Sequence, residues 1–179
     1  MHIKRVGYYC AALAEQMGMD STFRDTIFHA SAMHDVGKIG VPDAILLKPT
    51  TFDAEEWQVI KKHPERGAGI LGGISASPYI TMGKEIALGH HERWDGGGYP
   101  HGRRGEEIPL SARIMALGDI YDALRARHPY KPPYPHEQAL EIITVGDGRT
   151  RPEHFDPMVL AAFKACTDTF REIYDAHAD

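Results

Sequence analysis

Apolar residues recur along most of the chain with the spacing of an α-helix. In the first segment, intervals of three and four residues place Val6, Tyr9, Cys10, Leu13, Ala14 and Met17 on one helical face, and Gly18 can end that helix. Similar patterns predict helices over residues 22–35, 53–63, 65–74, 79–91, 110–126, 136–145 and 157–176. No segment shows the period-two alternation of a β-strand. The pattern therefore predicts an all-α fold, a single helical bundle.

Capping residues and helix breakers refine this picture. Asp53 with Glu56 three residues later predicts a capping box, and Asp156 with Pro157 predicts the start of the last helix. Residues 37–49 contain glycines and prolines at intervals that no long helix tolerates, so we expect an ordered loop there.

The domain organisation predicted for residues 1–179 is one domain, because no repeat, low-complexity tract or linker interrupts the chain. The apolar stripe of the first helix is already running at residues 2–6 and no capping residue precedes it. We therefore expect a fragment of a longer chain with an upstream sensory or receiver domain.

Composition narrows the functional classes. The chain carries 20 Lys and Arg against 25 Asp and Glu, a net charge of −5, without a basic block, which disfavours a duplex nucleic-acid partner. Cys10 and Cys166 are far apart, which argues against a disulfide framework or a thiolate zinc site. No apolar run approaches the roughly 18 to 20 residues of a membrane span, and no signal-peptide pattern opens the chain. We expect a cytoplasmic protein without membrane contact from this chain.

Histidines and aspartates gather near the ends of the predicted helices or beside loops. In a bundle, side chains in such places can converge from different helices. Taken singly, each has an ordinary alternative, such as a histidine at a helix terminus or a hydrogen-bonded buried carboxylate. Together they favour a metal site. The set is His2, His34, Asp35, His63, His90, His91 and Asp119.

Five segments in order along the chain resemble the HD-GYP branch of the HD-domain metal-dependent phosphohydrolases. They are HDVGKIGVPDAIL at 34–46, HHERWDGGGYP at 90–100, GDIYDAL at 118–124, HPYK at 128–131 and HFDP at 154–157. The joint presence of HDxGK and HHExxDGxGYP makes the resemblance specific. It implies a helical bundle that takes part in bacterial signal transduction by hydrolysing the second messenger cyclic di-GMP to linear pGpG, and in many members on to GMP.

The resemblance also implies a metal centre. Asp35 would bridge two divalent ions, with His34 and Asp119 on one and His63, His90 and His91 on the other, while His2 matches the first-helix histidine of the family. Two adjacent ions could neutralise a phosphodiester, activate water and stabilise the leaving oxygen. Imidazole and carboxylate ligands suit iron or manganese, without excluding zinc, nickel or cobalt. Some members bind a third metal through a glutamate one turn before the first histidine, a position that precedes Met1 here.

Two further parts of the site follow from the resemblance. Lys38 would reach the scissile phosphate, where a cation stabilises the transition state; its alternative is a solvated lysine. The GYP loop consists of Asp95, Gly96, Gly98, Tyr99 and Pro100 with the residues between them. Its glycines let the backbone approach a ligand, and Tyr99 could stack on guanine. The loop would shape the substrate entrance or contact a cyclase-type (GGDEF) domain; a plain turn is the alternative, and a homodimer is left open.

The chain departs from the family pattern in the segment where nucleotide-binding residues are expected. Lys131 is present, but His128 stands where arginine is common, and neutral imidazole cannot form the bidentate fork of a guanidinium. Arg125 could partly replace that arginine, or it could face solvent. Pro152 stands where glycine is usual, which should stiffen the approach to the last helix.

Three functions remain open at this point. The favoured one is a cyclic di-GMP phosphodiesterase. The others are a non-hydrolytic regulatory module that binds nucleotide or a partner through the GYP loop, and an HD phosphohydrolase for another cyclic dinucleotide.

Overall fold

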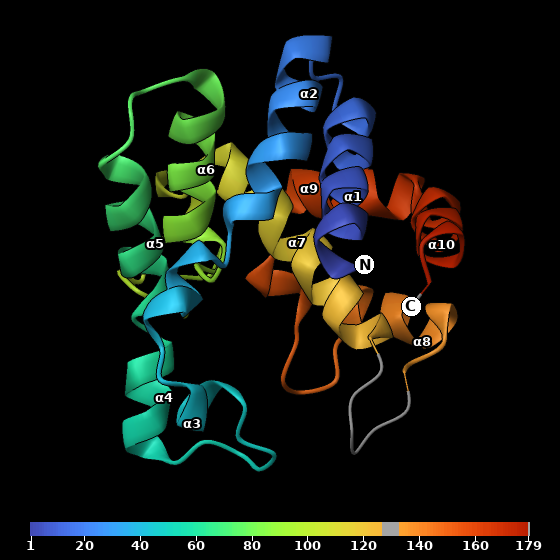
Figure 1. Cartoon of the computed structure of the whole chain (residues 1–179). Coiled ribbons are helices and arrows are strands. Elements are labelled where there is room, and N and C mark those ends of the chain that lie inside the picture. Colours follow the sequence, from blue (N-terminus) through green and yellow to red (C-terminus); the bar gives the residue numbers. More distant parts are fainter. Residues whose placement is uncertain (127–132, 179) are drawn as a thin grey trace.

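The computed structural model describes residues 1–126 and 133–178, and helices supply all the regular secondary structure in these ranges (Figure 1). The α-helices are α1 His2–Gln16, α2 Ser21–Ala30, α3 Asp43–Leu46, α4 Ala54–Ile60, α5 His63–Gly72, α6 Pro78–Gly89, α7 Leu110–Arg125, α8 His136–Thr144, α9 Pro157–Ala165 and α10 Thr167–Ala176. Four short 3₁₀ helices are η1 Ser31–Met33, η2 Val36–Gly40, η3 Gly105–Glu107 and η4 Pro152–His154. The all-α prediction is confirmed.

Helix α1 lies at the centre of the core. Its apolar face, which includes Tyr9 and Leu13, has no solvent exposure, and the helix packs against α2, α7, α9 and α10. The Tyr9 ring stacks on Phe170 at 4.6 Å and meets Tyr121 edge-on at 5.2 Å. Helices α5 and α6 pack together, and α5 also contacts η2. Helices α3 and α4 lie at the lower left of Figure 1, apart from the rest of the bundle.

The capping signals in the sequence are confirmed. The Asp53 carboxylate accepts a hydrogen bond from the Glu56 backbone at 2.9 Å, and the Glu56 carboxylate accepts one from the Asp53 backbone at 2.9 Å. At the start of α9, the Asp156 side chain accepts from the backbone N–H of Met158 at 2.7 Å. Each cap satisfies an N–H that has no partner within its helix.

The predicted helix over residues 22–35 is wrong in its second half. The α-helix ends at Ala30 and the chain continues through η1 and η2. The Ser31 hydroxyl donates to the Phe28 carbonyl at 2.8 Å, so a side chain competes for the backbone at this point. Gly37 approaches α5 so closely that a β-carbon would lie 1.9 Å from the His63 carbonyl oxygen. The tighter turn thus presses the HDxGK segment against α5.

Two other predicted elements also differ. The expected helix over residues 157–176 is two helices, α9 and α10, separated at Cys166. The break lets Phe163 and Phe170, whose ring centroids are 4.9 Å apart, both be fully buried in the core. Within the predicted loop at 37–49, the structure forms η2 and the single helical turn α3. In the described ranges, no helix combines the length and the apolarity that a membrane crossing requires.

His136 makes the stability of the bundle sensitive to acid. Its Nδ1 lies 2.8 Å from the Tyr121 hydroxyl, and the same hydroxyl accepts a hydrogen bond from Arg125 at 3.0 Å. Burial, followed by the positive charge of Arg125, lowers the pKa of His136. A histidine with a lowered folded-state pKa stabilises the fold above its unfolded value of about 6.5 and loses that contribution as the pH falls towards the folded value.

We therefore expect the free energy of unfolding to decrease as the pH falls below about 6.5, and His136→Gln to decrease less steeply. Urea unfolding at pH 7.5, 6.5 and 5.5 measures both slopes. Equal slopes for wild type and His136→Gln would contradict this assignment.

Candidate metal centre

Two groups of potential metal ligands converge between the ends of several helices. One group contains Asp35, His63, His90 and His91, and the other contains His2, His34 and Asp119; within each group the donor atoms lie within 4.8 Å of one another. His2 begins α1, His63 begins α5, His90 follows α6 and Asp119 lies on α7. The structure therefore brings together all seven residues that the sequence singled out.

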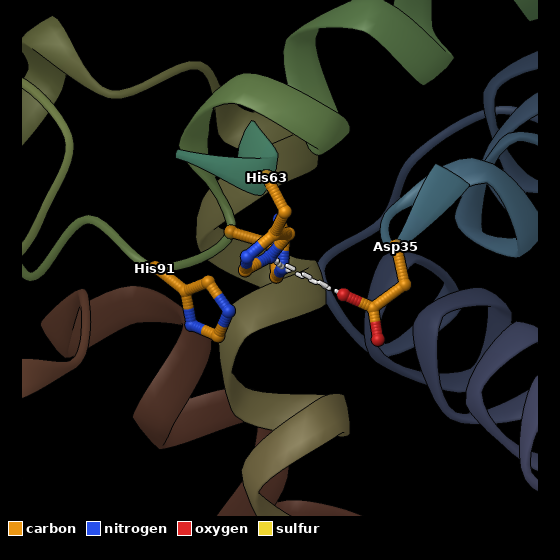
Figure 2. A group of neighbouring side chains, drawn as sticks. Asp35, His63 and His91 are labelled. Atoms are coloured by element: carbon orange, nitrogen blue, oxygen red, sulfur yellow. Dashed lines mark hydrogen bonds and ion pairs between the residues drawn. The ribbon is translucent and has the colours of Figure 1, made fainter. Parts of the chain in front are cut away.

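Asp35 lies between the two groups. Its Oδ2 is 3.3 Å from Nε2 of His34, and its Oδ1 is 3.3 Å from Nε2 of His63. Figure 2 shows the Asp35 carboxylate, from the segment that joins η1 to η2, pointing towards His63, with His91 on the far side. Oδ1 is buried and has no hydrogen-bond partner. A buried carboxylate oxygen of this kind is costly to leave unsatisfied, and a cation would satisfy it.

Three histidines have their Nδ1 atoms held by backbone carbonyls. Nδ1 of His34 lies 2.9 Å from the Ser31 carbonyl, that of His63 lies 2.8 Å from Ile60, and that of His90 lies 3.0 Å from Ile86. A carbonyl can only accept, so Nδ1 carries the hydrogen and Nε2 presents its lone pair.

These lone pairs face one another. Nε2 of His63 lies 3.4 Å from Nε2 of His90, and two acceptors cannot form a hydrogen bond. With the unsatisfied Asp35 oxygen beside them, the nitrogens form a donor set that fits a divalent metal ion. The described residues thus contain a His/Asp cluster that could bind metal.

His2 is oriented by a carboxylate that the sequence analysis missed. Nδ1 of His2 lies 2.8 Å from Oδ2 of Asp122, and its Nε2 lies 3.4 Å from that of His34. Asp122 is fully buried, and Arg5 donates to its two oxygens at 2.7 and 3.0 Å. Burial alone would raise the pKa of Asp122, but the hydrogen bonds from His2 and Arg5 hold it below its usual value. The spacing of Asp122, one turn after Asp119, was the signal that could have revealed it.

The pKa shifts of Asp35, His63 and His91 favour the protonation states that bind a metal ion, whereas at His34 the effect of burial is outweighed by Asp35 and Asp119 and the pKa is raised. Burial would raise the pKa of Asp35, but the neighbouring imidazoles of His34 and His90 and the ammonium group of Lys38 hold it well below its usual range. Burial lowers the pKa of His63 to about 4, and it also lowers the pKa of His91. At neutral pH, Asp35 is therefore ionised while His63 and His91 are uncharged.

Lys38 lies directly beside the cluster. Its Nζ donates to Oδ2 of Asp35 at 2.5 Å, and its side chain is 37% exposed. The ammonium group is therefore both anchored at the centre and accessible to an anion. Lys38 is therefore not a freely solvated lysine, and its contact to a phosphate stays a prediction.

The GYP loop folds back over the histidines. The Tyr99 ring stacks on His91 at 4.6 Å, and its backbone N–H donates to the His91 carbonyl at 3.1 Å. Gly98 leaves no room for a β-carbon, which would lie 2.5 Å from that same carbonyl oxygen. The buried Glu92 carboxylate accepts from the backbones of His101 at 2.8 Å and Arg103 at 3.0 Å. The loop is therefore an ordered wall of the site.

Other members of the GYP loop shape its backbone. Asp95 accepts from the Gly97 N–H at 2.8 Å and from Arg93 at 2.9 Å, and Gly96 adopts a φ of +82°. Pro100 follows a cis peptide bond. In this structure Asp95 serves the turn and lies outside the two groups of potential ligands.

Arg125 occupies a structural position. Its guanidinium donates to the Tyr121 hydroxyl, stacks over Tyr174 at 4.0 Å and lies 3.7 Å from Asp175. The side chain is buried, so the expectation of a solvent-facing arginine is wrong, while a contact to nucleotide stays a prediction. His128 and Lys131 lie outside the described residues.

A cavity of about 550 Å³ adjoins the centre. His90, His91, Tyr99 and Asp119 lie on its inner side, and Trp57 and Lys61 also line it. Its volume falls within the range of roughly 300 to 1,000 Å³ that is typical of small-molecule sites.

Comparison with known proteins places this site in a family. Residues 2–159 match the family model described as HD domain. A cyclic di-GMP phosphodiesterase of Thermotoga maritima is 44% identical over 97% of this chain and 47% of that protein. The 3′3′-cGAMP-specific phosphodiesterase 2 of Vibrio cholerae is 43% identical over 94% of this chain and 31% of that protein. The chain thus spans less than half the length of these relatives.

A comparison with solved structures finds a similar fold. The crystal structure of a cyclic GMP-AMP-specific phosphodiesterase of Vibrio cholerae superposes with a TM-score of 0.70 at 19% identity, over 99% of this chain and 46% of that chain. With the family match and the HDxGK and HHExxDGxGYP motifs in place, the chain belongs to the HD-domain family, in its HD-GYP branch.

Proposed function

We propose that this domain is a metal-dependent phosphodiesterase that hydrolyses cyclic di-GMP to linear pGpG, with further hydrolysis to GMP left open. The observation that carries the proposal is the buried Asp35 carboxylate, unsatisfied at Oδ1 and placed between two groups of imidazole ligands. The name of the Thermotoga maritima relative, a cyclic di-GMP phosphodiesterase, supports the choice of substrate.

The metal centre that we propose contains two divalent ions, iron or manganese. Asp35 would contribute to both ions, His34 and Asp119 with His2 beside them would hold one, and His63, His90 and His91 would hold the other. When bound, such a pair neutralises phosphate charge, lowers the pKa of water and stabilises the leaving oxygen. Imidazole and carboxylate donors without thiolate suit these metals.

The chain's own residues supply the rest of the site. Lys38 places a positive charge beside Asp35, where it can stabilise negative charge that develops on the phosphate. Tyr99 packs on His91 and so restricts the orientation of that imidazole. The adjoining cavity gives a nucleotide room to lie against the centre.

A different cyclic dinucleotide is the second candidate. The Vibrio cholerae relative that is specific for 3′3′-cGAMP is about as similar to this chain as the cyclic di-GMP enzymes are. A non-hydrolytic regulatory module is less well supported, because both groups of potential ligands are complete. Contact of the GYP loop with a cyclase-type (GGDEF) domain stays a prediction.

Product chromatography separates these candidates. We expect the metal-loaded protein to convert cyclic di-GMP to pGpG, and to act less well on 3′,3′-cGAMP. Preferred turnover of the hybrid dinucleotide would favour the second candidate. Binding of metal and nucleotide without any product would favour the regulatory module and contradict our proposal.

His128 supplies a prediction about affinity. A charge-assisted hydrogen bond contributes roughly 1.5 to 3 kcal/mol, which corresponds to about ten- to a hundredfold in affinity. If the arginine common at this position in the family contacts nucleotide, His128→Arg should tighten cyclic di-GMP binding by that factor and leave metal content unchanged. Isothermal titration of both proteins measures the difference. Equal affinities would show that position 128 makes no such contact.

A further inference from the structure

Trp57 and Lys61 line the cavity beside the metal centre. Trp57 lies on α4 and is 41% exposed. Its ring is nearly parallel to that of Phe52, at 6.4 Å and 16°, and meets the Tyr99 ring at 5.9 Å and 74°. The tryptophan is therefore held between the rim of the cavity and the GYP loop, with a large part of its surface still open.

Lys61 lies at the C-terminal end of α4, on the same side of the helix as Trp57. It comes four residues after Trp57, and its backbone N–H donates to the Trp57 carbonyl at 3.0 Å, so the two side chains are neighbours. Within residues 1–126 and 133–178, Lys61 forms no ion pair, whereas Lys48 pairs with Glu56 at 2.6 Å and Lys38 pairs with Asp35 at 2.5 Å. Lys61 is thus a half-buried lysine without an ion pair in the described residues, and it lines the cavity.

We infer that Trp57 and Lys61 form a subsite for the second nucleotide of the substrate, with Lys61 on its phosphate and Trp57 against its purine. The inference rests on the proposed function. A cyclic dinucleotide carries two phosphodiesters and two bases, and Lys38 with the metal centre accounts for one phosphate only. A second cation in the cavity would strengthen binding of the second phosphate, and a purine gains affinity from an exposed aromatic ring.

The subsite should affect cyclic dinucleotides more than substrates with a single phosphate. Kinetics of the metal-loaded protein with cyclic di-GMP and with bis(p-nitrophenyl) phosphate test this difference. We expect Lys61→Gln and Trp57→Leu to raise KM for cyclic di-GMP about five- to a hundredfold, the range for loss of a charge-assisted bond or a stacked base. The ratio of kcat/KM for cyclic di-GMP to that for the small diester should fall accordingly.

Two matched controls lie close by. Lys62 is the exposed neighbour of Lys61, and Trp94 lines a different cavity, with Pro152 and Pro157. Lys62→Ala and Trp94→Phe should keep the wild-type ratio. Because Trp57 and Trp94 are the only tryptophans, cyclic di-GMP should quench a fluorescence signal that Trp57→Phe removes and Trp94→Phe retains.

The outcomes distinguish the two proposals. If the wild type hydrolyses cyclic di-GMP and the ratio is unchanged in both Lys61→Gln and Trp57→Leu, the subsite is wrong while the proposed function stands. If the wild type hydrolyses the small diester but neither binds nor hydrolyses a cyclic dinucleotide, the proposed function fails and the subsite fails with it. Quenching that persists in Trp57→Phe would also overturn the placement of the purine.

Discussion

Asp35→Ala is expected to lose both metals and all measurable phosphodiesterase activity. Its two carboxylate oxygens face different groups of imidazoles, at 3.3 Å from His34 and 3.3 Å from His63, so its removal affects both proposed ions. The loss should exceed the roughly 10- to 100-fold that removal of an outer-shell partner costs in metal affinity or activity. Metal analysis after dialysis and turnover of cyclic di-GMP measure the two effects.

Two further variants make this result specific. Asp35→Asn keeps the shape of the side chain but removes the negative charge, and it should fail to retain the metal pair. Asp43→Ala removes an exposed carboxylate at the start of α3 and should keep metal and activity. A fully active Asp35→Ala protein would contradict a bridging role for this residue.

Asp122→Ala should be among the most destabilising substitutions in the described chain. Asp122 and Arg5 are almost completely buried, and removing the carboxylate leaves the guanidinium charge without its main partner. Breaking a buried ion pair in this way costs about 3–5 kcal/mol, or roughly 6 to 20 °C in Tm for a domain of this size. Thermal unfolding measures the loss. Lys48→Ala, which breaks a more exposed pair with Glu56, should cost no more than about 1 kcal/mol.

A double variant separates stability from metal binding. Arg5→Met with Asp122→Leu removes both charges together and should recover much of the stability, because apolar residues of similar size can replace a buried pair. The same protein still lacks the carboxylate that orients His2, so its metal affinity should stay about 10- to 100-fold below the wild type. Full recovery of metal affinity would show that Asp122 is structural only.

Residue patterns predicted the all-α class and the clustering of the seven potential ligands, while the family motifs supplied their expected roles. The Asp122 contact to His2 was missed because it joins residues 120 positions apart. The burial of Arg125 was also missed, since it depends on Tyr174 arriving from α10. Helical periodicity likewise could not show that the α-helix stops at Ala30, because Ser31 and the close approach of Gly37 to α5 decide that end.

The position of Tyr99 was also only partly predictable from the sequence. The GYP motif indicated an aromatic ring at a flexible loop, and its expected partners were guanine or another protein. In the structure the ring stacks on His91, and Gly98 permits this because its backbone lies against residues 91–93. The glycine content alone suggested a flexible loop, whereas the contacts of the loop show that it is ordered.

The most direct test is the rate of cyclic di-GMP hydrolysis as iron(II) or manganese(II) is added back to metal-free protein, with bound metal measured at each point. We expect no activity without metal and a rate that rises to a plateau at two ions per chain. Hydrolysis by the metal-free protein, or two bound ions without hydrolysis of any cyclic dinucleotide, would contradict a two-metal phosphodiesterase at this site.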